Sequence, residues 1–297
     1  MAVITWCTKE DCNPGKWARA VVIAWVVVVC GSCSGPMNRG QGGGAAVSPR
    51  LRVLSYNVWV GFKNDDKRRD RAAAWIAAQK PDVVALQELN GYTIDKLQED
   101  ARAWGHPYVQ LCQVKSGYHL GLTSREPIGN VHLVLVKGVS KGILHGQTCG
   151  IDFFVLHLAA RPEDVRLRET AVVLPEIRKI QSADRPSVLL GDFNSPSRLD
   201  AAYYQREAKY PAQYNVMDQY YRGGWVDVVR QHQVEMSEQQ ASHPSRLIEN
   251  KWGSWRIDYI LASPQLADKC IDARVVKESA TDDLSDHYPV IADFDWP

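Results

Sequence analysis

Two short stretches of the sequence decide the fold and the location of its chemistry. One is Ser285-Asp286-His287-Tyr288-Pro289-Val290, near the C-terminus, and the other is Gly191-Asp192-Phe193-Asn194. Each places acidic, amide or imidazole groups next to an apolar run with the composition of a buried strand. Strand ends are rigid supports on which a functional site can be built. Two such runs, together with polar residues at other strand ends, predict a common site.

Outward from these stretches, short apolar runs alternate with helical segments, which predicts an α/β protein. Helices are expected at residues 67–79, 93–103 and 163–181, with Pro175 as a kink or break in the last. Strands are expected at residues 51–58, 82–86, 119–124, 131–136, 151–158, 188–190, 257–261, 273–276 and 290–294, with a loop-rich insert from 195 to about 249. Hairpins mixed with helices favour two sheets packed face to face and flanked by helices over a single parallel sheet.

The composition is that of a globular protein with a full core. Of the 297 residues, 45% are hydrophobic and 23% are charged. Residues 1–47 carry four basic and two acidic residues, which leaves 31 basic and 32 acidic residues in the rest of the chain. A body this close to neutrality lacks the broad basic field that dominates nonspecific nucleic-acid binding, which counts against a protein that coats DNA.

The first 47 residues have the pattern of a targeting segment. Lys16 and Arg19 precede an apolar run at residues 20–29, which is short for a membrane span of about 20 residues. Small residues around Cys33 resemble a bacterial lipoprotein processing site, and a Gly-rich stretch at residues 40–46 follows. A lipoprotein signal, an ordinary cleaved signal and an uncleaved anchor all remain open. We expect an exported protein, secreted or tethered to a membrane, with its catalytic domain at residues 48–297.

The cysteines of the body do not indicate a metal or disulfide framework. Cys112, Cys149 and Cys270 show no C-x-x-C spacing of the kind that binds zinc. An odd number of cysteines allows at most one bridge. The simplest interpretation is three small apolar residues in the interior.

Two polar residues end the first strands of the body. Glu88 follows an apolar strand, where a carboxylate either ligates a hard cation or caps a turn. Asn57 ends the first strand, where its amide either holds a metal-bound water, positions Glu88 or forms an Asx-turn.

The remaining strand ends supply an acceptor, a donor and imidazoles. Asp192 offers an acceptor that orients water, and Asn194, two residues on, offers a neutral donor to phosphoryl oxygens. His287 is expected to pair with a nearby carboxylate, either Asp286 in its own loop or Asp258 at another strand end. His157 closes a further strand and is either a core residue or a donor to a phosphate. Together, the carboxylates, amides and imidazoles at these strand ends point to metal-assisted phosphoester hydrolysis.

These residues also carry a resemblance to a known family. The order of motifs resembles that of the endonuclease/exonuclease/phosphatase superfamily, with its deoxyribonuclease I-like fold, over about residues 50–297: Asn57, Gln87-Glu88, His157-Leu158, Gly191-Asp192-Phe193-Asn194, Asp258-Tyr259 and Ser285-Asp286-His287. The resemblance implies a four-layer α/β sandwich of two mixed sheets flanked by helices.

The same resemblance implies a role for each residue. Glu88 binds the metal, with Asn57 and Asp286 near it. Asp192 orients the attacking water, and Asn194 and His157 contact the scissile phosphate. His287 paired with Asp258 completes the centre, as base or as electrostatic stabiliser. The implied cofactor is Mg²⁺, with Mn²⁺ as the alternative ion.

The substrate is left open by the sequence. A nucleic acid, a phospholipid headgroup, as in sphingomyelinase-like members, and a small phosphoester all remain candidates, and we expect a monomer. A tethered binding module without turnover is the alternative from another class. Because Glu88, Asp192, Asn194 and His287 are all present, an active enzyme is favoured.

Several aromatic and basic residues are candidates for substrate contact. Tyr118 and Arg125 lie in a region where family members often touch substrate, although a solvated Arg125 is the simpler interpretation. Trp104 and Trp225 are expected to pack in the sandwich. The turn Trp252-Gly253-Ser254-Trp255 is the best candidate for an exposed aromatic pair.

Overall fold

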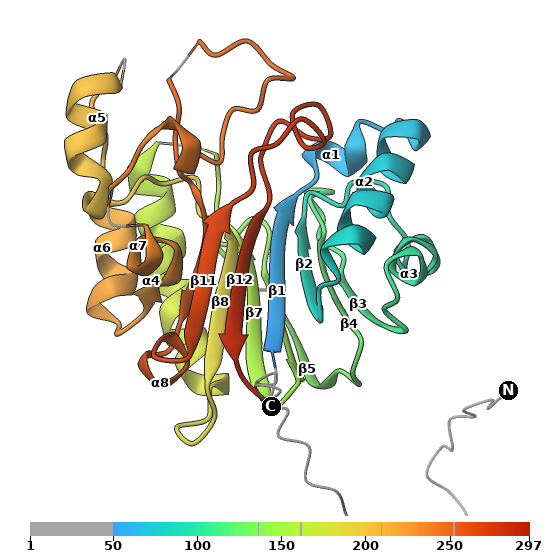
Figure 1. The fold of residues 1–297 in the computed structure, drawn as a ribbon. Coiled ribbons are helices and arrows are strands. Elements are labelled where there is room, and N and C mark those ends of the chain that lie inside the picture. The colour runs from blue at the N-terminus through green and yellow to red at the C-terminus, as the bar shows by residue number, and fades with distance from the viewer. Residues whose placement is uncertain (1–49, 136, 161, 209, 234, 252) are drawn as a thin grey trace, which may run out of the picture. The chain divides into compact units, whose positions relative to one another are not determined.

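The body of the protein is a sandwich of two six-stranded sheets flanked by helices, as predicted (Figure 1). The computed structural model describes residues 50–135, 137–160, 162–208, 210–233, 235–251 and 253–297. The targeting segment expected at residues 1–47 lies outside the described residues. No helix in the described ranges combines the length and apolar character needed to cross a membrane.

Each sheet mixes parallel and antiparallel neighbours. The first has the order β11 (Cys270–Val275), β12 (Val290–Asp295), β1 (Arg50–Asn57), β2 (Val83–Gln87), β4 (Leu120–Ser124) and β3 (Tyr108–Cys112). The second has the order β5 (Gly129–Val134), β6 (Ile143–Thr148), β7 (Ile151–His157), β8 (Ser187–Asp192), β10 (Asp258–Ala262) and β9 (Val226–Asp227). In each sheet the central pair, β1 with β2 or β7 with β8, is parallel.

Alternating side chains divide the interior into three apolar layers. Val53 of β1 and Val155 of β7 contribute to the cluster between the sheets, where residues of both sheets are buried. Their neighbours Leu54 and Phe154 point the other way, into the clusters beneath the helices. This period of two is what a strand buried on both faces requires. The central strands are therefore mostly apolar, and most of their polar side chains lie near the strand ends.

Helices cover both outer faces. Beside the first sheet lie α1 (Trp59–Phe62), α2 (Asp66–Gln79) and α3 (Ile94–Ala103), and beside the second lie α4 (Glu163–Ile180) and α6 (Asn215–Arg222) (Figure 1). Asp65 and Thr93 cap α2 and α3 by accepting backbone N–H groups of the first turn. The other helical segments are α5 (Ala201–Glu207), α7 (Val228–His232), α8 (Pro264–Ala267) and the 3₁₀ turns η1 (Arg198–Asp200) and η2 (Glu238–Gln240).

The structure corrects several sequence expectations. Helix α4 runs through Pro175 without a break, since Val173, Leu174 and Ile177 bury one face on the second sheet. The insert predicted to be loop-rich carries three α-helices, α5, α6 and α7. Strands β3 and β6 were not predicted. Strand β6 contains His145, Gly146 and Gln147, which interrupt the apolar pattern.

The three cysteines of the body, Cys112, Cys149 and Cys270, are free thiols. Cys112 and Cys270 are buried, as expected, whereas Cys149 is half-buried.

The strand directions bring distant polar residues to one edge of the sandwich. β1, β2, β7 and β8 end at this edge, while β10 and β12 run antiparallel to β8 and β1 and begin there. In register, Asp192 lies opposite His157 on one side and Asp258 on the other. Gly191, just before it, has φ of 137°, and a Cβ there would lie 2.0 Å from the carbonyl oxygen of Leu156.

We predict that Gly191→Ala destabilises the protein by on the order of 3 kcal/mol or more, because it combines a backbone clash with a strained φ. The measurement is the free energy of unfolding in urea. Gly129→Ala is the matched control, since its Cβ would meet nothing within 4 Å. Equal stability of the two variants would contradict this account of the close approach between β7 and β8.

Candidate functional site

All eight residues singled out in the sequence lie at this edge. Hydrogen bonds or short ionic contacts connect them into one group: Asn57, Glu88, His157, Asp192, Asn194, Asp258, Asp286 and His287. Seven of the eight are hydrogen-bonded or ion-paired across sequence separations of 29 residues or more. The structure shows that these residues lie together at one edge, whereas the chemical role of each one remains a prediction.

The amide of Asn57 connects the two sheets. Its Nδ2 donates to Glu88 Oε1 at 3.3 Å and to Asp192 Oδ2 at 3.0 Å, while its Oδ1 accepts the backbone N–H of Trp59. The Asn57 side chain is fully buried. In this orientation Asn57 presents a donor to the carboxylates, so it holds Glu88 and Asp192 in place.

A left-handed turn fixes the other side of Glu88. The six residues 59–64 all have positive φ, and the backbone N–H of Val60 donates to Glu88 Oε2 at 2.9 Å. Gly61 is required in this turn because a Cβ there would lie 2.4 Å from the carbonyl oxygen of Asn90. Glu88 itself has φ of 61°. Left-handed residues cost free energy, and such strain clusters where a side chain must be aimed.

The loop after β8 holds Asp192 by both oxygens. Oδ1 accepts the backbone N–H of Asn194 at 2.8 Å, and Oδ2 accepts its Nδ2 at 3.1 Å. Asn194 adopts φ of 48°, which lets the loop turn back, and its Nδ2 also donates to the carbonyl of Leu158. Burial, reinforced by the charge of Asp258, raises the pKa of Asp192 to about 7. Asp192 can thus exchange a proton near neutrality.

His287 and Asp258 form a buried pair. His287 Nδ1 lies 2.8 Å from Asp258 Oδ2, and its Nε2 faces Asp192 Oδ2 at 3.8 Å. Burial alone lowers the pKa of His287, but the carboxylates of Asp258, Asp192 and Asp286 outweigh it and raise the pKa to about 10. His287 is therefore an imidazolium at neutral pH, with Nε2–H directed into the site.

Asp258 is positioned by an ionic network under the site. Arg256, two residues before Asp258, is fully buried and pairs with Asp227 at 2.7 Å and with Asp200 at 2.6 Å. Both aspartates come from the insert between β8 and β10. Removing one partner of a buried pair is costly, because it leaves an uncompensated charge. The insert thereby fixes the start of β10.

His157 differs from His287 although both are buried. Its Nε2 lies 3.4 Å from Asp192 Oδ2 and 3.7 Å from Glu88 Oε1. Burial, together with the positive charges of Lys141 and His287, holds the pKa of His157 well below its usual range. His157 is thus a neutral imidazole, which can exchange hydrogen bonds but does not supply positive charge.

Lys141 is the principal residue that the sequence analysis missed. Its Nζ lies 2.6 Å from His157 Nε2 and donates to the carbonyl of Leu158 at 3.0 Å. Lys141 is 7% exposed although lysine is almost never so deeply buried without a partner. It lies in the connection between β5 and β6, and because β6 itself was not predicted, no sequence pattern pointed to Lys141.

A second missed residue is His243. Its ring lies 4.7 Å from that of His287, centroid to centroid, and it falls with Asp286 and His287 in a group whose ligand atoms lie within 4.8 Å of one another. Burial, with the positive charge of His287, lowers the pKa of His243 to about 3. Its place in the loop before β10, outside any strand, gave no periodic signal.

The site fits a hard divalent cation. Asp286 is 16% exposed at its side chain and Glu88 is 14% exposed. Burial, with the charges of Glu88 and Asp258, raises the pKa of Asp286 to about 6. Carboxylate oxygens are the ligands that Mg²⁺ or Mn²⁺ prefers. A cation between neighbouring carboxylates would also relieve the repulsion between their negative charges. Glu88 falls with His157 and Asp192 in one group of ligand atoms close enough to hold an ion, and Asp286 falls with His243 and His287 in another. The amide nitrogen of Asn57 faces the carboxylates.

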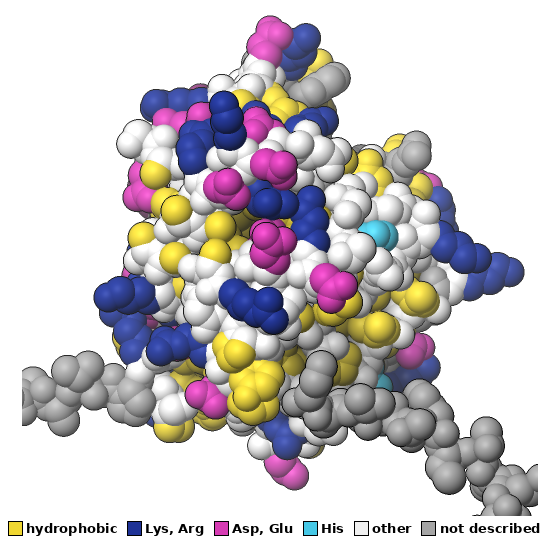
Figure 2. Space-filling view, turned by 90° about the vertical axis from the view of Figure 1, so that its right-hand side faces the viewer, with side chains coloured by type: hydrophobic (Ala, Val, Ile, Leu, Met, Phe, Trp, Pro, Cys, Tyr) yellow, Lys and Arg dark blue, Asp and Glu magenta, His cyan; other side chains and the backbone are white. Residues whose placement is uncertain are grey.

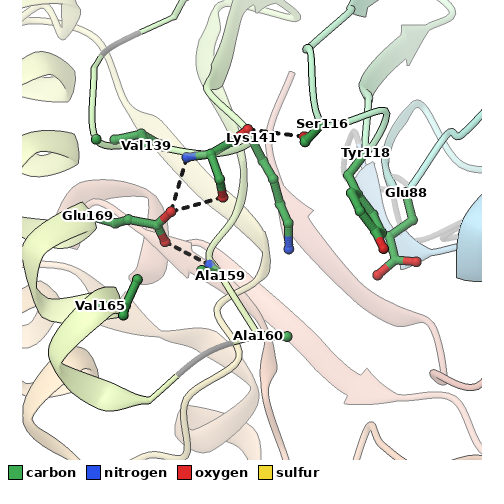
Figure 3. A pocket seen from close by; sticks show the side chains of 11 residues that line it. Glu88, Ser116, Tyr118, Val139, Lys141, Ala159, Ala160, Val165 and Glu169 are labelled. Atoms are coloured by element: carbon green, nitrogen blue, oxygen red, sulfur yellow. Dashed lines mark hydrogen bonds between the residues drawn. The ribbon is translucent and has the colours of Figure 1, made fainter.

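A cavity of about 620 Å³ opens beside these residues. Lys141 extends into it from one loop, with Tyr118 and Glu88 on one side and Ala159 and Ala160 on the other (Figure 3). The ring of Tyr118 stands edge-on to that of His157, with centroids 6.1 Å apart.

The other predicted contact residues lie elsewhere or pack inward. Arg125 pairs with Asp82 and is exposed, and Trp104 and Trp225 are buried. Of the aromatic pair predicted to be exposed, Trp255 is half-buried and stacks on Tyr204 with centroids 4.9 Å apart. Trp252 lies outside the described residues. On the face shown in Figure 2, basic and acidic side chains of the described residues are intermixed, in agreement with the near-neutral body.

Comparison with known proteins places the chain among phosphoester hydrolases. Residues 54–287 match the model of the endonuclease/exonuclease/phosphatase family. An uncharacterized protein of Caenorhabditis elegans is 25% identical over 181 residues, and the match covers 52% of this chain and only 57% of that relative's length.

Solved structures show the same fold. An AP endonuclease from Archaeoglobus fulgidus has a TM-score of 0.67 and 20% identity, covering 82% of this chain and 99% of that one. The 3' phosphatase NExo from Neisseria, bound to a product DNA hairpin, has a TM-score of 0.62 and 22% identity, covering 83% of this chain and 100% of that one.

We predict that Asp258→Asn lowers the pKa of His287 by more than about one unit, because it removes the strongest of the charges that raise it. In the native protein the imidazolium stabilises the fold fully below about pH 6.5, and this contribution is lost as pH rises through about 10. NMR titration of the imidazole measures the change. Asp295→Asn, at the exposed end of β12, is the control and is expected to leave the titration unchanged.

Proposed function

This chain belongs to the endonuclease/exonuclease/phosphatase family of phosphoester hydrolases, and we propose that it hydrolyses a phosphodiester or phosphomonoester by in-line attack of water, dependent on Mg²⁺ or Mn²⁺. The observation that carries the proposal is the single polar group at one edge, in which Asp192 accepts hydrogen bonds from Asn57 and Asn194 and faces two imidazoles.

Asp192 is suited to orient the attacking water. Its two oxygens are held by donors from Asn57 and Asn194, so the carboxylate has a fixed direction. Burial and the charge of Asp258 raise the pKa of Asp192, which makes it a stronger base than an exposed carboxylate. A general base works best when its pKa lies near the operating pH.

Two groups are suited to stabilise the negative charge of the phosphoryl oxygens: His287, an imidazolium held by Asp258, and Lys141 beside His157. Asn194 would contact the phosphate only by releasing one of the two hydrogen bonds that its amide donates to Asp192 and Leu158. Fixed donors in a site that excludes water stabilise a transition state more than solvent does. A divalent cation held by Glu88 and Asp286 would supply further positive charge to the same oxygens.

We favour a nucleic-acid type of phosphoester as substrate. NExo, which shares this fold, was crystallised with a product DNA hairpin. Phospholipid headgroups and small phosphoesters remain the alternatives. A panel of DNA, sphingomyelin, inositol phosphates and bis(p-nitrophenyl) phosphate, each assayed with the purified protein and Mg²⁺, distinguishes them. Turnover of none by a folded, metal-bound protein would support a binding module instead.

We also propose that residues 1–47 direct export, on the basis of the short apolar run and the small residues around Cys33. Mass spectrometry of the N-terminus from cells separates a lipidated Cys33 from a cleaved signal and from an intact anchor.

We predict that His287→Ala lowers kcat by about 10²- to 10⁴-fold, because a charged donor to the transition state is lost. The exposed His132→Ala is the control. Near-native turnover of His287→Ala on every substrate cleaved would contradict the assignment.

For Glu88→Gln we expect a weakened dependence on the metal, since one carboxylate ligand is replaced by a neutral amide. The Mg²⁺ concentration that gives half-maximal activity should rise by about tenfold or more. Glu99→Gln on the exposed face of α3 is the matched control. An unchanged Mg²⁺ requirement would place the ion elsewhere.

A further inference from the structure

The cavity beside the site determines which substituent of the phosphate can be accommodated. Because it borders on both Glu88 and Lys141, a phosphate that lies between Asp192, His157 and Asn194 can direct one of its ester groups toward it. Its volume of about 620 Å³ falls within the range of about 300–1,000 Å³ that holds compact organic ligands. A group of nucleoside size therefore fits, whereas a continuous duplex does not.

Lys141 places a positive charge at the entrance. Two N–H groups of its ammonium are used by His157 Nε2 and the carbonyl of Leu158, which leaves a third for a ligand. The ammonium also lies 5.2 Å from the centre of the Tyr118 ring. Burial lowers the pKa of Lys141, but the carboxylates of Asp192, Glu88 and Glu169 act against that effect and favour its charged form.

Among the lining residues that the structure describes, none offers a free negative charge away from the catalytic edge. Tyr118, Val139, Ala160 and Val165 are apolar or aromatic. Glu169, the acidic residue deeper in the cavity, accepts hydrogen bonds from the backbone and hydroxyl of Ser140 and from the backbone of Ala159 (Figure 3). Its carboxylate is engaged by the protein. A cationic group entering here would meet Lys141, while the carboxylate of Glu88, at the catalytic edge of the cavity, would be engaged by the metal ion of the proposed function.

On the basis of the proposed function, we infer that Lys141 contacts a phosphoryl oxygen of the substrate and is a specificity-determining residue. It selects phosphoesters whose cavity-bound group is neutral or anionic and of nucleoside size. It excludes quaternary ammonium headgroups, because their charge would lie beside the Lys141 ammonium. The aromatic face that would otherwise attract such a cation is already occupied by Lys141.

Three esters with one leaving group test this selectivity in the full-length protein: the p-nitrophenyl esters of thymidine 5'-monophosphate, of phosphocholine and of methyl phosphate. In each, water adds to phosphorus and p-nitrophenolate leaves, so only the retained group differs. We expect kcat/KM to be highest for the thymidine ester, by about tenfold or more over the methyl ester, and lowest for the choline ester.

Variants of Lys141 assign the selectivity to its charge. Lys141→Met keeps the stem and removes the charge, and it should lower the ratio of thymidine to choline kcat/KM by about tenfold. Lys141→Arg retains the charge and should largely retain the ratio. Lys115→Met, at an exposed lysine that does not line the cavity, is the matched control. Melting temperatures establish that each variant folds.

A variant of the wall tests the cavity independently. Ala160→Trp reduces the space beside Lys141 and should lower kcat/KM for the thymidine ester by about tenfold, while the methyl ester changes by less than about twofold. Equal loss on both esters would overturn the assignment of the cavity to the retained group.

The outcomes separate this inference from the proposed function. Cleavage of the choline ester as efficiently as the thymidine ester, or an unchanged ratio in Lys141→Met, overturns the inference but leaves the phosphoesterase intact. If no ester is cleaved, the proposed function fails. Calorimetry with thymidine 5'-monophosphate and phosphocholine then decides the inference. Tighter binding of the nucleotide, lost in Lys141→Met, supports it, and equal binding overturns it.

Discussion

The site depends on the register of three neighbouring strands in the second sheet. Parallel pairing of β7 with β8 sets His157 beside Asp192, and antiparallel pairing of β8 with β10 sets Asp258 on its other side. A slip of one residue would turn each of these side chains to the opposite face. The missing side chain of Gly191 lets the backbones of β7 and β8 approach closely. Geometry of the sheet, more than any loop, thus brings the chemistry together.

Charge balance is the second constraint on this edge. Four carboxylates lie close together at this buried or partly buried edge: Glu88, Asp192, Asp258 and Asp286. The cations that face them are His287 and Lys141. Such crowding raises the pKa of Asp192 and Asp286 while it keeps His287 protonated. The two imidazoles are in opposite states, because burial and the charge of Lys141 lower the pKa of His157, whereas three carboxylates outweigh burial at His287. A divalent cation would offset the remaining negative charge.

Much of the fold was predictable from local patterns. The apolar runs that end in Asn57, Gln87 and Asp192 are central strands buried on both faces, and their composition reflects that. Strands β3 and β6 escaped prediction because an edge strand and a strand interrupted by Gly146 need not be apolar throughout. The helices of the insert have short apolar faces, as α6 does with Val216, Met217 and Tyr220, which a search for long periodic segments overlooks.

The sequence by itself determined the two-sheet sandwich and the set of residues at its polar edge, since strand composition and strand-end polarity are local properties. Only the tertiary structure decided how those residues meet and which others join them. Lys141 and His243 lie in connections without periodicity, and their protonation depends on burial and on charges supplied by distant strands. Burial and through-space charge arise from chain segments that are remote in sequence, so no local pattern encodes them.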